Sequence, residues 1–539
     1  MIFTRLVLLA GLASRALSGT TGTKRAAGKS SLIGPSVTLD YGTFNGVEDD
    51  STKIISFRGV RFADAPVGNL RWRAPVSPPS KHLGTVNASQ FGDICIQAGQ
   101  TKVDAGSSED CLFGNVFIPS ATKADSKLPV LVWFHGGGFQ VGDTHGSPPE
   151  LILGSSAEPL IFVSFEYRLG QFGFLGGAEI GADGAHNAGL LDQRAALRWV
   201  QRYIHLFGGD TSKVTIWGES AGAGSTMFHL IANNGNNEGL FRAAMGDSPS
   251  LSFTPPSDGT YIQAVFDQFA GFAGCKTASD LGCLRSASSA TLTLAGSKLL
   301  NARPDTLFVF APNFDSTFIT TRPVEAFKAG LFAHVPILFG SNTNEGAHWS
   351  AELSDPAANT SMPNATEVTV FNFMHGQWDT LEQDKVDSSL ALYPLATFNG
   401  SFSLQGQQMY GESRYICTAV MMTAAVSAVQ GEKAFQFHYD NPHLSSDHGA
   451  ELDAFFNPPS NSDANDLALF EAMREYWTSF VTTGSPSAKN AAQWKPVSDS
   501  ATGSPRILLH PAGIAMEQVS ETLSSHCDFW HGLADEMQV

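Results

Sequence analysis

The sequence predicts an α/β fold in which helices cover both faces of a large, mostly parallel sheet. Two apolar runs, Leu128–Phe134 and residues 160–165, lack the alternation of half-exposed strands and so indicate strands buried on both faces. Apolar residues between positions 196 and 207 recur at helical spacing, and Gly208-Gly209 then ends the pattern. Strands that alternate with helices in this way are typical of the α/β class.

The remaining elements follow the same pattern along the chain. Residues 37–61 suggest a small antiparallel meander, with the clearest strand at 52–60, and a proline-rich loop follows at 66–79. Later strands are expected at 335–339 and 434–439, and a late helix at 466–483 is closed by Gly484. Trp494 and residues 506–509 complete the expected core. Two further segments, 250–330 and 350–430, are predicted to be mostly helical insertions.

The chain of 539 residues is expected to form one large domain after a secretion signal. Arg5 precedes a short apolar run, and small residues before Ser18 fit a cleavage site, so residues 1–18 are predicted to be a signal peptide. Residues 19–34 are predicted to be disordered and contain a candidate dibasic processing site at Lys24-Arg25. Residues 35–539 show no internal repeat and no independent second unit. The C-terminus is polar and offers no hydrophobic anchor tail.

Charge and cysteine content point to the same class of protein. The chain carries 33 basic and 51 acidic residues, a formal net charge of −18, which argues against nucleic acid and anionic membranes as partners. Six cysteines fit three disulfides in an oxidising compartment, and spacing suggests Cys95–Cys111, Cys275–Cys283 and Cys417–Cys527 among the 15 possible pairings. None lies in a Cys-x-x-Cys pair, so zinc is not expected. Four sequons fit surface glycosylation, at Asn87, Asn359, Asn364 and Asn399.

A candidate nucleophile lies in the pentapeptide Gly218-Glu219-Ser220-Ala221-Gly222. It follows the expected strand 214–217 and precedes small residues that can begin a helix at 221–232. A sharp strand–turn–helix of this kind holds a serine hydroxyl out of the sheet beside the positive end of a helix. The pentapeptide alone fits a glycine-rich loop equally well. Its assignment as a nucleophile site therefore depends on motifs elsewhere in the chain.

Donors for an oxyanion are expected in the loop His135-Gly136-Gly137-Gly138-Phe139. The loop directly follows the buried strand Leu128–Phe134, and its glycines leave backbone N–H groups unshielded. A further donor would be the N–H group of Ala221, next to the serine. The alternative is a flexible turn at a strand end, which the separate serine motif disfavours.

An acid and a base are expected after later strands, in the order Ser, acid, His that is usual for an α/β-hydrolase. Glu345 is the one carboxylate in the loop after strand 335–339. Three histidines lie in or after strand 434–439. His438 falls within the strand and is expected to pack there. Spacing favours His448 over His443 as the base, because Gly449 gives the backbone freedom to present the ring, but it leaves both open.

The ordered motifs resemble the type-B carboxylesterase/lipase family, which includes cholinesterases and fungal lipases, over residues 35–535. The matching stretches are residues 57–63 with Pro66 and Arg71, 109–112 with Asn115-Val116, 135–139, 167–170 with 172–175, 187–193, and 207–220. The resemblance implies an α/β-hydrolase fold that needs no cofactor, and it implies the three disulfides. It also implies Ser220 as nucleophile, Glu345 as acid and His448 as base. Gly137, Gly138 and Ala221 are implied as oxyanion donors.

Two departures from the family bear on the substrate. The loop between Cys95 and Cys111 holds 15 residues with few apolar side chains and no tryptophan. Similar lipases carry a longer amphipathic lid there, and cholinesterases carry a choline-binding tryptophan. Both departures argue against a quaternary-ammonium substrate and, more weakly, against interfacial lipase action. Taken with the motifs above, the sequence predicts a secreted serine esterase acting on small-molecule or lipid esters. A triacylglycerol lipase is the first alternative, and a non-catalytic binding protein on the same scaffold is the second.

Overall fold

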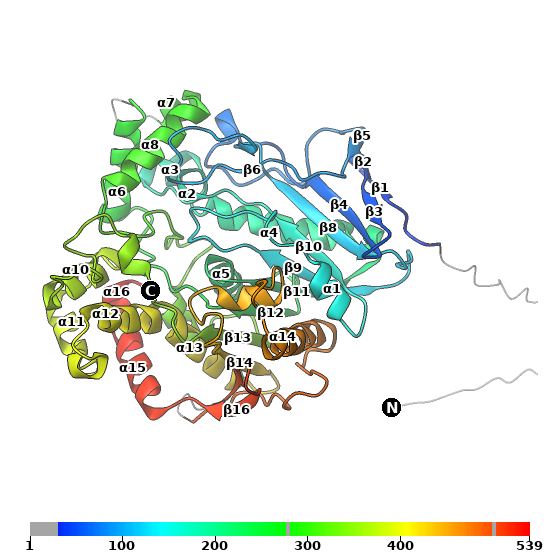
Figure 1. Ribbon diagram of the computed structural model, residues 1–539. Helices are drawn as coiled ribbons and strands as arrows, with labels where there is room; N and C mark the ends of the chain where they lie inside the picture. The colour runs from blue at the N-terminus through cyan, green and yellow to red at the C-terminus, as the bar shows by residue number, and fades with distance from the viewer. Residues whose placement is uncertain (1–30, 276–280, 499–502) are drawn as a thin grey trace, which may run out of the picture.

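An 11-stranded mixed sheet runs through the centre of the molecule (Figure 1). The computed structural model describes residues 31–275, 281–498 and 503–539. The strands of this sheet, in spatial order, are β16 (Ala515–Gln518), β15 (Pro505–Leu509), β14 (Ala434–Tyr439), β13 (Ile337–Asn342), β12 (Ala243–Asp247), β11 (Gly209–Gly218), β9 (Leu128–Phe134), β10 (Ile161–Phe165), β8 (Phe113–Pro119), β4 (Ile54–Arg61) and β3 (Val47–Asp49). The pairs from β15 to β10 are parallel, whereas the pairs at both edges are antiparallel.

Helices cover both faces of the sheet, and smaller sheets lie beside it. The helices are α1 (Glu150–Ser155), α2 (Gly170–Gly173), α3 (Ala178–Asp183), α4 (Ala188–Tyr203), α5 (Ala221–Gly235), α6 (Thr260–Phe272), α7 (Leu281–Ser286), α8 (Ser289–Asn301), α9 (Pro323–Ala329), α10 (Glu367–Gln377), α11 (Gln383–Ser389), α12 (Phe402–Gly411), α13 (Cys417–Ser427), α14 (Ala464–Thr483), α15 (Glu521–Gly532) and α16 (Ala534–Met537). Short 3₁₀ turns are η1 (Gly68–Leu70), η2 (Ile204–Phe207), η3 (Trp349–Glu352), η4 (Leu395–Phe398) and η6 (Ala450–Ala454), and η5 (Glu412–Ile416) is a π-helical turn. The smaller sheets are β1 (Ser36–Leu39), β2 (Gly42–Asn45) and β5 (Thr85–Asn87), and β6 (Ile94–Cys95) with β7 (Ser107–Ser108).

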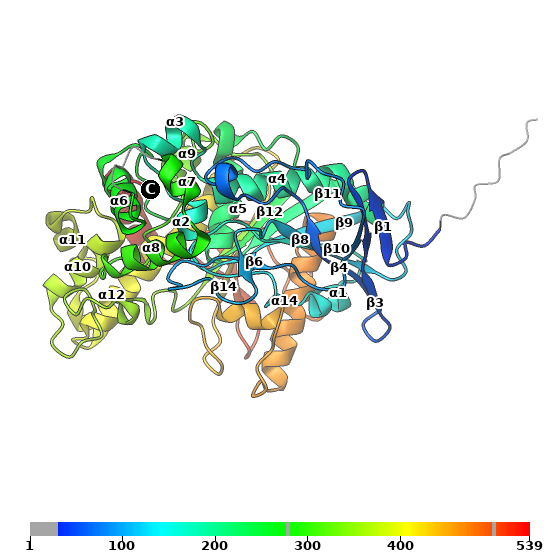
Figure 2. The same ribbon diagram turned by 90° about the horizontal axis from the view of Figure 1, so that it is seen from above.

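The central strands are buried on both faces, as their apolar sequences predict. Along β9, Val130 and Val132 join the core beneath α4 and α5, whereas Leu131 and Trp133 join the core beneath α14. The turned view shows α4 and α5 on one side of the strands and α14 on the other (Figure 2). Because side chains alternate along a strand, one run of apolar residues supplies both cores.

Several predicted boundaries shift in the structure. The helix expected at 196–207 begins earlier, at Ala188, and its last turn is the 3₁₀ turn η2. The strand expected at 335–339 is β13, which starts and ends later. Both insertions are mostly helical. Helices α6 to α8 and α10 to α12 lie on the left in Figure 1, away from β1 to β5, whereas α13 lies against β13 and β14.

The N-terminal expectations fall largely outside the described residues. The predicted signal peptide at 1–18 and the Lys24-Arg25 site both lie there. Residues 31–34, the end of the segment expected to be disordered, instead lie against the domain. The N–H of Ile33 donates to the carbonyl of Thr122 at 2.9 Å, and its side chain is buried. Burial of this apolar side chain offsets part of the entropy that the short stretch loses when it is ordered.

Three disulfides link the described residues: Cys95–Cys111, Cys275–Cys283 and Cys417–Cys527. They are the three pairs that the spacing suggested. The third joins α13 to α15 and closes a loop with a sequence separation of 110 residues, whereas the second closes one of 8.

Removing these disulfides is expected to destabilise the protein unequally. Loop-closure entropy gives about 4–5 kcal/mol for the loop of Cys417–Cys527 and roughly half of that for the loop of Cys275–Cys283. The double variant Cys417→Ala/Cys527→Ala should therefore show a larger fall in thermal unfolding midpoint than Cys275→Ala/Cys283→Ala. An equal or smaller fall for the long loop would contradict this entropic account.

Candidate active site

Ser220 occupies a strained turn between β11 and α5. Its φ is +55° and its ψ is −119°, a conformation that non-glycine residues seldom adopt. Glycine is required beside it, because a Cβ on Gly222 would lie 2.0 Å from the carbonyl oxygen of Phe134. The backbone N–H of Ser220 donates to the backbone carbonyl of Asp247 at 2.9 Å, which ties the turn to the end of β12. This is the geometry of a nucleophile elbow.

A chain of hydrogen bonds joins Ser220, His448 and Glu345. The Oγ of Ser220 lies 2.8 Å from Nε2 of His448, and Nδ1 of His448 lies 2.5 Å from Oε2 of Glu345. If Nδ1 carries the proton and donates to Glu345, Nε2 is free to accept the serine proton. The three residues follow β11, β14 and β13, whose carboxyl ends meet at one edge of the parallel sheet.

Glu345 is held by neighbours as well as by His448. Its Oε1 accepts hydrogen bonds from the hydroxyl of Ser248 at 2.5 Å and from the backbone N–H of Asn342 at 2.6 Å. The carboxyl group is buried, so these donors fix its position. Ser248 was not among the sequence predictions. Its position could have revealed it, because a polar residue directly after β12 lies near the carboxyl ends of the neighbouring strands.

Other carboxyl groups crowd beneath the site. Oε1 of Glu219 lies 3.2 Å from Nε2 of His448, and Asp247 and Glu451 are also fully buried. Burial, and then charge repulsion from neighbouring carboxylates, raises the pKa of Glu219 and of Glu451 well above the usual range; burial also raises that of Asp247. Burial therefore favours the protonated form of all three groups. Sequence reasoning missed their clustering, because they come from separate segments.

The glycine loop lies beside Ser220, where oxyanion donors are needed. Gly137 and Gly138 have φ values of +103° and +62°, and a Cβ on Gly138 would overlap the ring of Phe308 at 2.0 Å. Within the described chain, neither N–H group donates to a backbone carbonyl. The N–H of Ala221 opens α5, at the positive end of that helix. A Cβ on Gly136 would lie 3.2 Å from the Cβ of Ser220, so the glycine loop passes close to the serine.

The loop is supported from below by Glu166 and Tyr167. One carboxyl oxygen of Glu166 accepts from the N–H and hydroxyl of Thr144, at 2.8 and 2.6 Å, and the other lies 3.9 Å from Nε2 of His135. Tyr167 stacks on His135 and donates its hydroxyl to the carbonyl of that residue at 2.8 Å. Burial raises the pKa of Glu166 to about 8 and lowers that of His135 to about 4. Both side chains are therefore neutral near pH 6.

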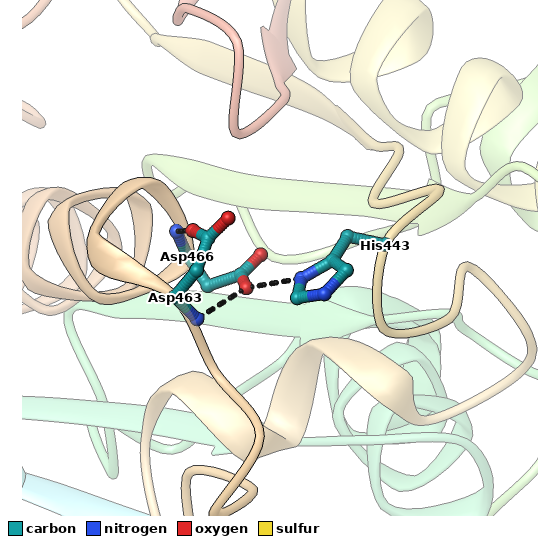
Figure 3. A group of neighbouring side chains, drawn as sticks. All are labelled: His443, Asp463 and Asp466. Atoms are coloured by element: carbon teal, nitrogen blue, oxygen red, sulfur yellow. Dashed lines mark hydrogen bonds and ion pairs between the residues drawn. The ribbon is translucent and has the colours of Figure 1, made fainter.

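The alternative histidines lie elsewhere. His443 is paired with Asp466 at 2.6 Å, at the start of α14 (Figure 3). Asp463 and Asp466 cap that helix, so their carboxylates already have partners. His438 hydrogen-bonds Thr343 and Glu517. Of the three histidines weighed from the sequence, His448 is the one that contacts Ser220.

This combination of sheet and elbow defines the class. A mostly parallel sheet with a serine on a strained turn between a strand and a helix is an α/β-hydrolase. Among residues 31–275, 281–498 and 503–539, no helix combines the length and apolar character needed to cross a bilayer.

Comparisons with known proteins identify the family. The chain matches the carboxylesterase family over residues 34–530. Lipase 4 of Diutina rugosa is 37% identical over 64% of this chain and 67% of its own length, although the match to Lipase 2 of that organism spans 58% of the relative. Secreted lipase 1 of Botryotinia fuckeliana is 32% identical over 84% of this chain and 85% of its own. Aspergillus niger EstA has a similar crystal structure, with a TM-score of 0.84 and 28% identity over 94% of this chain and 99% of EstA. The chain therefore belongs to the carboxylesterase family and is a carboxylic ester hydrolase.

Replacing Glu166 by glutamine should change how stability depends on pH. A carboxyl group with a pKa of 4.5 in the unfolded chain and about 8 in the folded protein stabilises the fold at low pH, and this contribution is lost as pH rises from 4.5 to 8. Glutamine cannot ionise and can still accept from Thr144. The variant Glu166→Gln should gain stability relative to the wild type as pH rises, on the order of 4 kcal/mol by pH 8.

Urea unfolding of both proteins at pH 5, 6.5 and 8 measures this difference. A difference in unfolding free energy that stays constant over that range would show that Glu166 is ionised in the folded protein.

Proposed function

We propose that this protein is a secreted serine esterase that hydrolyses carboxylic esters with Ser220, Glu345 and His448 as its triad. The observation that carries the proposal is the unbroken chain of hydrogen bonds from Ser220 through His448 to Glu345, at 2.8 and 2.5 Å. The link between Ser220 and His448 has the length that proton transfer requires, and the link to Glu345 orients the imidazole and stabilises its cation.

The reaction would proceed through an acyl-enzyme. As the Oγ of Ser220 bonds to the ester carbonyl carbon, Nε2 of His448 takes the hydroxyl proton. The tetrahedral oxyanion is held by the N–H groups of Gly137, Gly138 and Ala221, each contributing roughly 3–4 kcal/mol. His448 then protonates the leaving oxygen, the carbon–oxygen bond breaks and the alcohol departs. Water repeats the cycle on the acyl-serine: His448 takes its proton and returns it to Oγ as the acid leaves.

Secretion is supported by several observations. Relatives include a protein named Secreted lipase 1, and three disulfides suit an oxidising compartment. The sequons at Asn87, Asn364 and Asn399 are exposed, and Asn359 is half-buried. Exposure is what glycosylation at these positions would need.

Soluble esters are the favoured substrates, with triacylglycerols as the second candidate. The loop closed by Cys95 and Cys111 is short, and its strands β6 and β7 hold it as a small two-stranded sheet. Ile96 in this loop is buried instead of forming part of an exposed apolar lid. The lipase names of the relatives are the observation that favours triacylglycerols.

Replacing Ser220 by alanine should abolish turnover. Loss of the nucleophile is expected to lower kcat on p-nitrophenyl butyrate about 10⁴–10⁶-fold and to prevent labelling by a fluorophosphonate. Ser225→Ala is the matched control, because Ser225 lies on the same helix and bonds to Ala221 and Gln193. Turnover that survives in Ser220→Ala, with an intact control, would overturn the assignment of the nucleophile.

The physical state of the substrate separates the two candidates. A short, paired loop should give faster hydrolysis of dissolved p-nitrophenyl butyrate than of emulsified triolein, with no jump in rate when tributyrin passes its solubility limit. Initial rates measured across that limit provide the test. A sharp rise at the limit would assign the protein to the lipases instead.

A further inference from the structure

Arg414 is a buried cation without an anionic partner. Six arginines of the described chain are buried, and five of them pair with a carboxylate: Arg71 with Glu109, Arg168 with Asp192, Arg194 with Glu238, Arg285 with Asp183, and Arg506 with Glu517. Arg414 is 2% exposed and forms no ion pair with any described residue. A buried charge without a counter-charge is costly, so its presence calls for a reason.

The polar contacts of Arg414 leave part of its hydrogen-bonding capacity unused. Its Nη2 donates to the hydroxyl of Ser252 at a long 3.4 Å, and the hydroxyl of Tyr415 is another polar neighbour. Its Nε is buried without an acceptor. The hydroxyl of the neighbouring Tyr410 is also buried, and the hydroxyl of Tyr415 is its polar neighbour. Two buried groups that can donate therefore lie together, and an anion is the ligand that would accept from both.

Aromatic rings surround the guanidinium and compensate only part of the free-energy cost of burying its charge. Its Cζ lies 4.7 Å from the ring centre of Phe308, 5.7 Å from that of Tyr415 and 5.9 Å from that of Tyr410. A ring face attracts a cation by about 0.5–2 kcal/mol, less than a buried ion pair needs to replace lost hydration. The rings also exclude water, which would strengthen an interaction with a bound carboxylate.

The backbone at Arg414 is unusual as well. Residues Glu412–Ile416 form the π-helical turn η5 between α12 and α13. The carbonyl of Arg414 accepts from the N–H of Leu251 at 2.8 Å, across to the loop that follows β12. π-helical turns are rare and recur at functional sites, because the extra residue re-aims the side chains around it.

Arg414 lies one layer of side chains behind the proposed catalytic groups. Phe308, which packs on its guanidinium, occupies the space over Gly138 that a side chain there would fill. Tyr415 lies 4.3 Å from the ring of His448, and the N–H of Ser250 donates to the carbonyl of Ser220 at 3.4 Å. Phe308 and Trp349 pack against each other and are partly exposed. The rings of Phe308 and Tyr415 thus lie between the guanidinium and the groups around Ser220.

The net charge of the protein bears on which ligand Arg414 can bind. The protein as a whole is acidic, with a formal charge of −18, so its general field does not attract anions. A carboxylate on the substrate would therefore need a local cation, and a planar guanidinium fits a carboxylate by two parallel hydrogen bonds. The same charge would disfavour an entirely apolar acyl chain at this position.

We propose that Arg414, together with Tyr410 and Ser252, binds a carboxylate of the substrate, and that the enzyme prefers esters whose acyl part ends in a carboxylate. Monoesters of dicarboxylic acids are the substrate class. This inference rests on the proposed esterase function, because the ester group must reach Ser220 while the carboxylate reaches Arg414.

The test compares monomethyl adipate with methyl hexanoate, its neutral counterpart, by pH-stat at constant ionic strength. In the wild type, kcat/KM should be higher for monomethyl adipate. Arg414→Met should lower that value about 10–100-fold, mainly by raising KM, and leave methyl hexanoate within about threefold, since a hydrogen bond to a charged group contributes about 1.5–3 kcal/mol. Arg414→Lys, which keeps the charge, should retain part of the preference. Adipate should inhibit the wild type competitively and Arg414→Met only weakly.

Three results would overturn the inference. The first is a wild type without preference for the charged ester. The second is an equal fall for both esters in Arg414→Met together with a lower unfolding midpoint, because removal of an unpaired buried charge should leave that midpoint unchanged or raise it. The third is a preference for 6-acetoxyhexanoate over hexyl acetate that Arg414→Met removes, which would place the carboxylate on the alcohol side.

Labelling of Ser220 by a fluorophosphonate separates this inference from the proposed function. A wild type that takes up no label would overturn the esterase assignment and the carboxylate site with it. A labelled wild type without a preference for monomethyl adipate would overturn the carboxylate site alone.

Discussion

The strained turn at Ser220 is the constraint on which the rest of the site depends. A positive φ at a serine persists only where the surroundings leave no alternative. Here β11 and α5 approach so closely that a Cβ on Gly218 would lie 2.3 Å from the backbone of Gly222. Gly222 in turn packs on the end of β9, the strand that feeds the glycine loop. The position of the serine and the position of the loop are therefore set by the same contact.

Burial and hydrogen bonding distinguish the carboxyl groups at this end of the sheet. Burial raises the pKa of the carboxyl groups of Glu166, Glu219, Asp247 and Glu451 and so favours their neutral forms. Glu345 differs in its contacts, because Ser248 and Asn342 donate to it and His448 lies on its other oxygen. The buried carboxyl groups therefore fall into two kinds. Glu345, to which Ser248 and Asn342 donate, is the one whose oxygen lies at Nδ1 of His448.

The sequence revealed the parts of the site that local chemistry dictates. A strand, a Gly-x-Ser-x-Gly turn and a helix are contiguous, and the apolar runs of β9 and β10 are legible because both of their faces are buried. Spacing alone left His448 and His443 open, since both follow β14. What separates them is Asp466, which is distant in sequence and holds His443 at α14. Glu219, Ser248 and Glu166 went unnoticed for the same reason, because their partners come from other segments. The shift of β13 has a similar origin, since pairing with β12 and β14 sets its ends.

Division of labour between sheet and insertions follows from these contacts. The sheet ends position Ser220, Glu345 and His448, so the core fixes the hydrogen-bonded group that we propose as the triad. The side chains that lie over the site, Phe308, Trp349, Tyr410 and Tyr415, come from the segments between β12 and β14. Arg414 joins the two parts, because its carbonyl binds the loop after β12 while its side chain lies among those rings. A substitution in the second insertion can therefore alter which ester binds without moving the hydrogen bonds that join Ser220, His448 and Glu345. The unpaired charge of Arg414 destabilises the second insertion. We therefore attribute it to recognition of the substrate and not to folding.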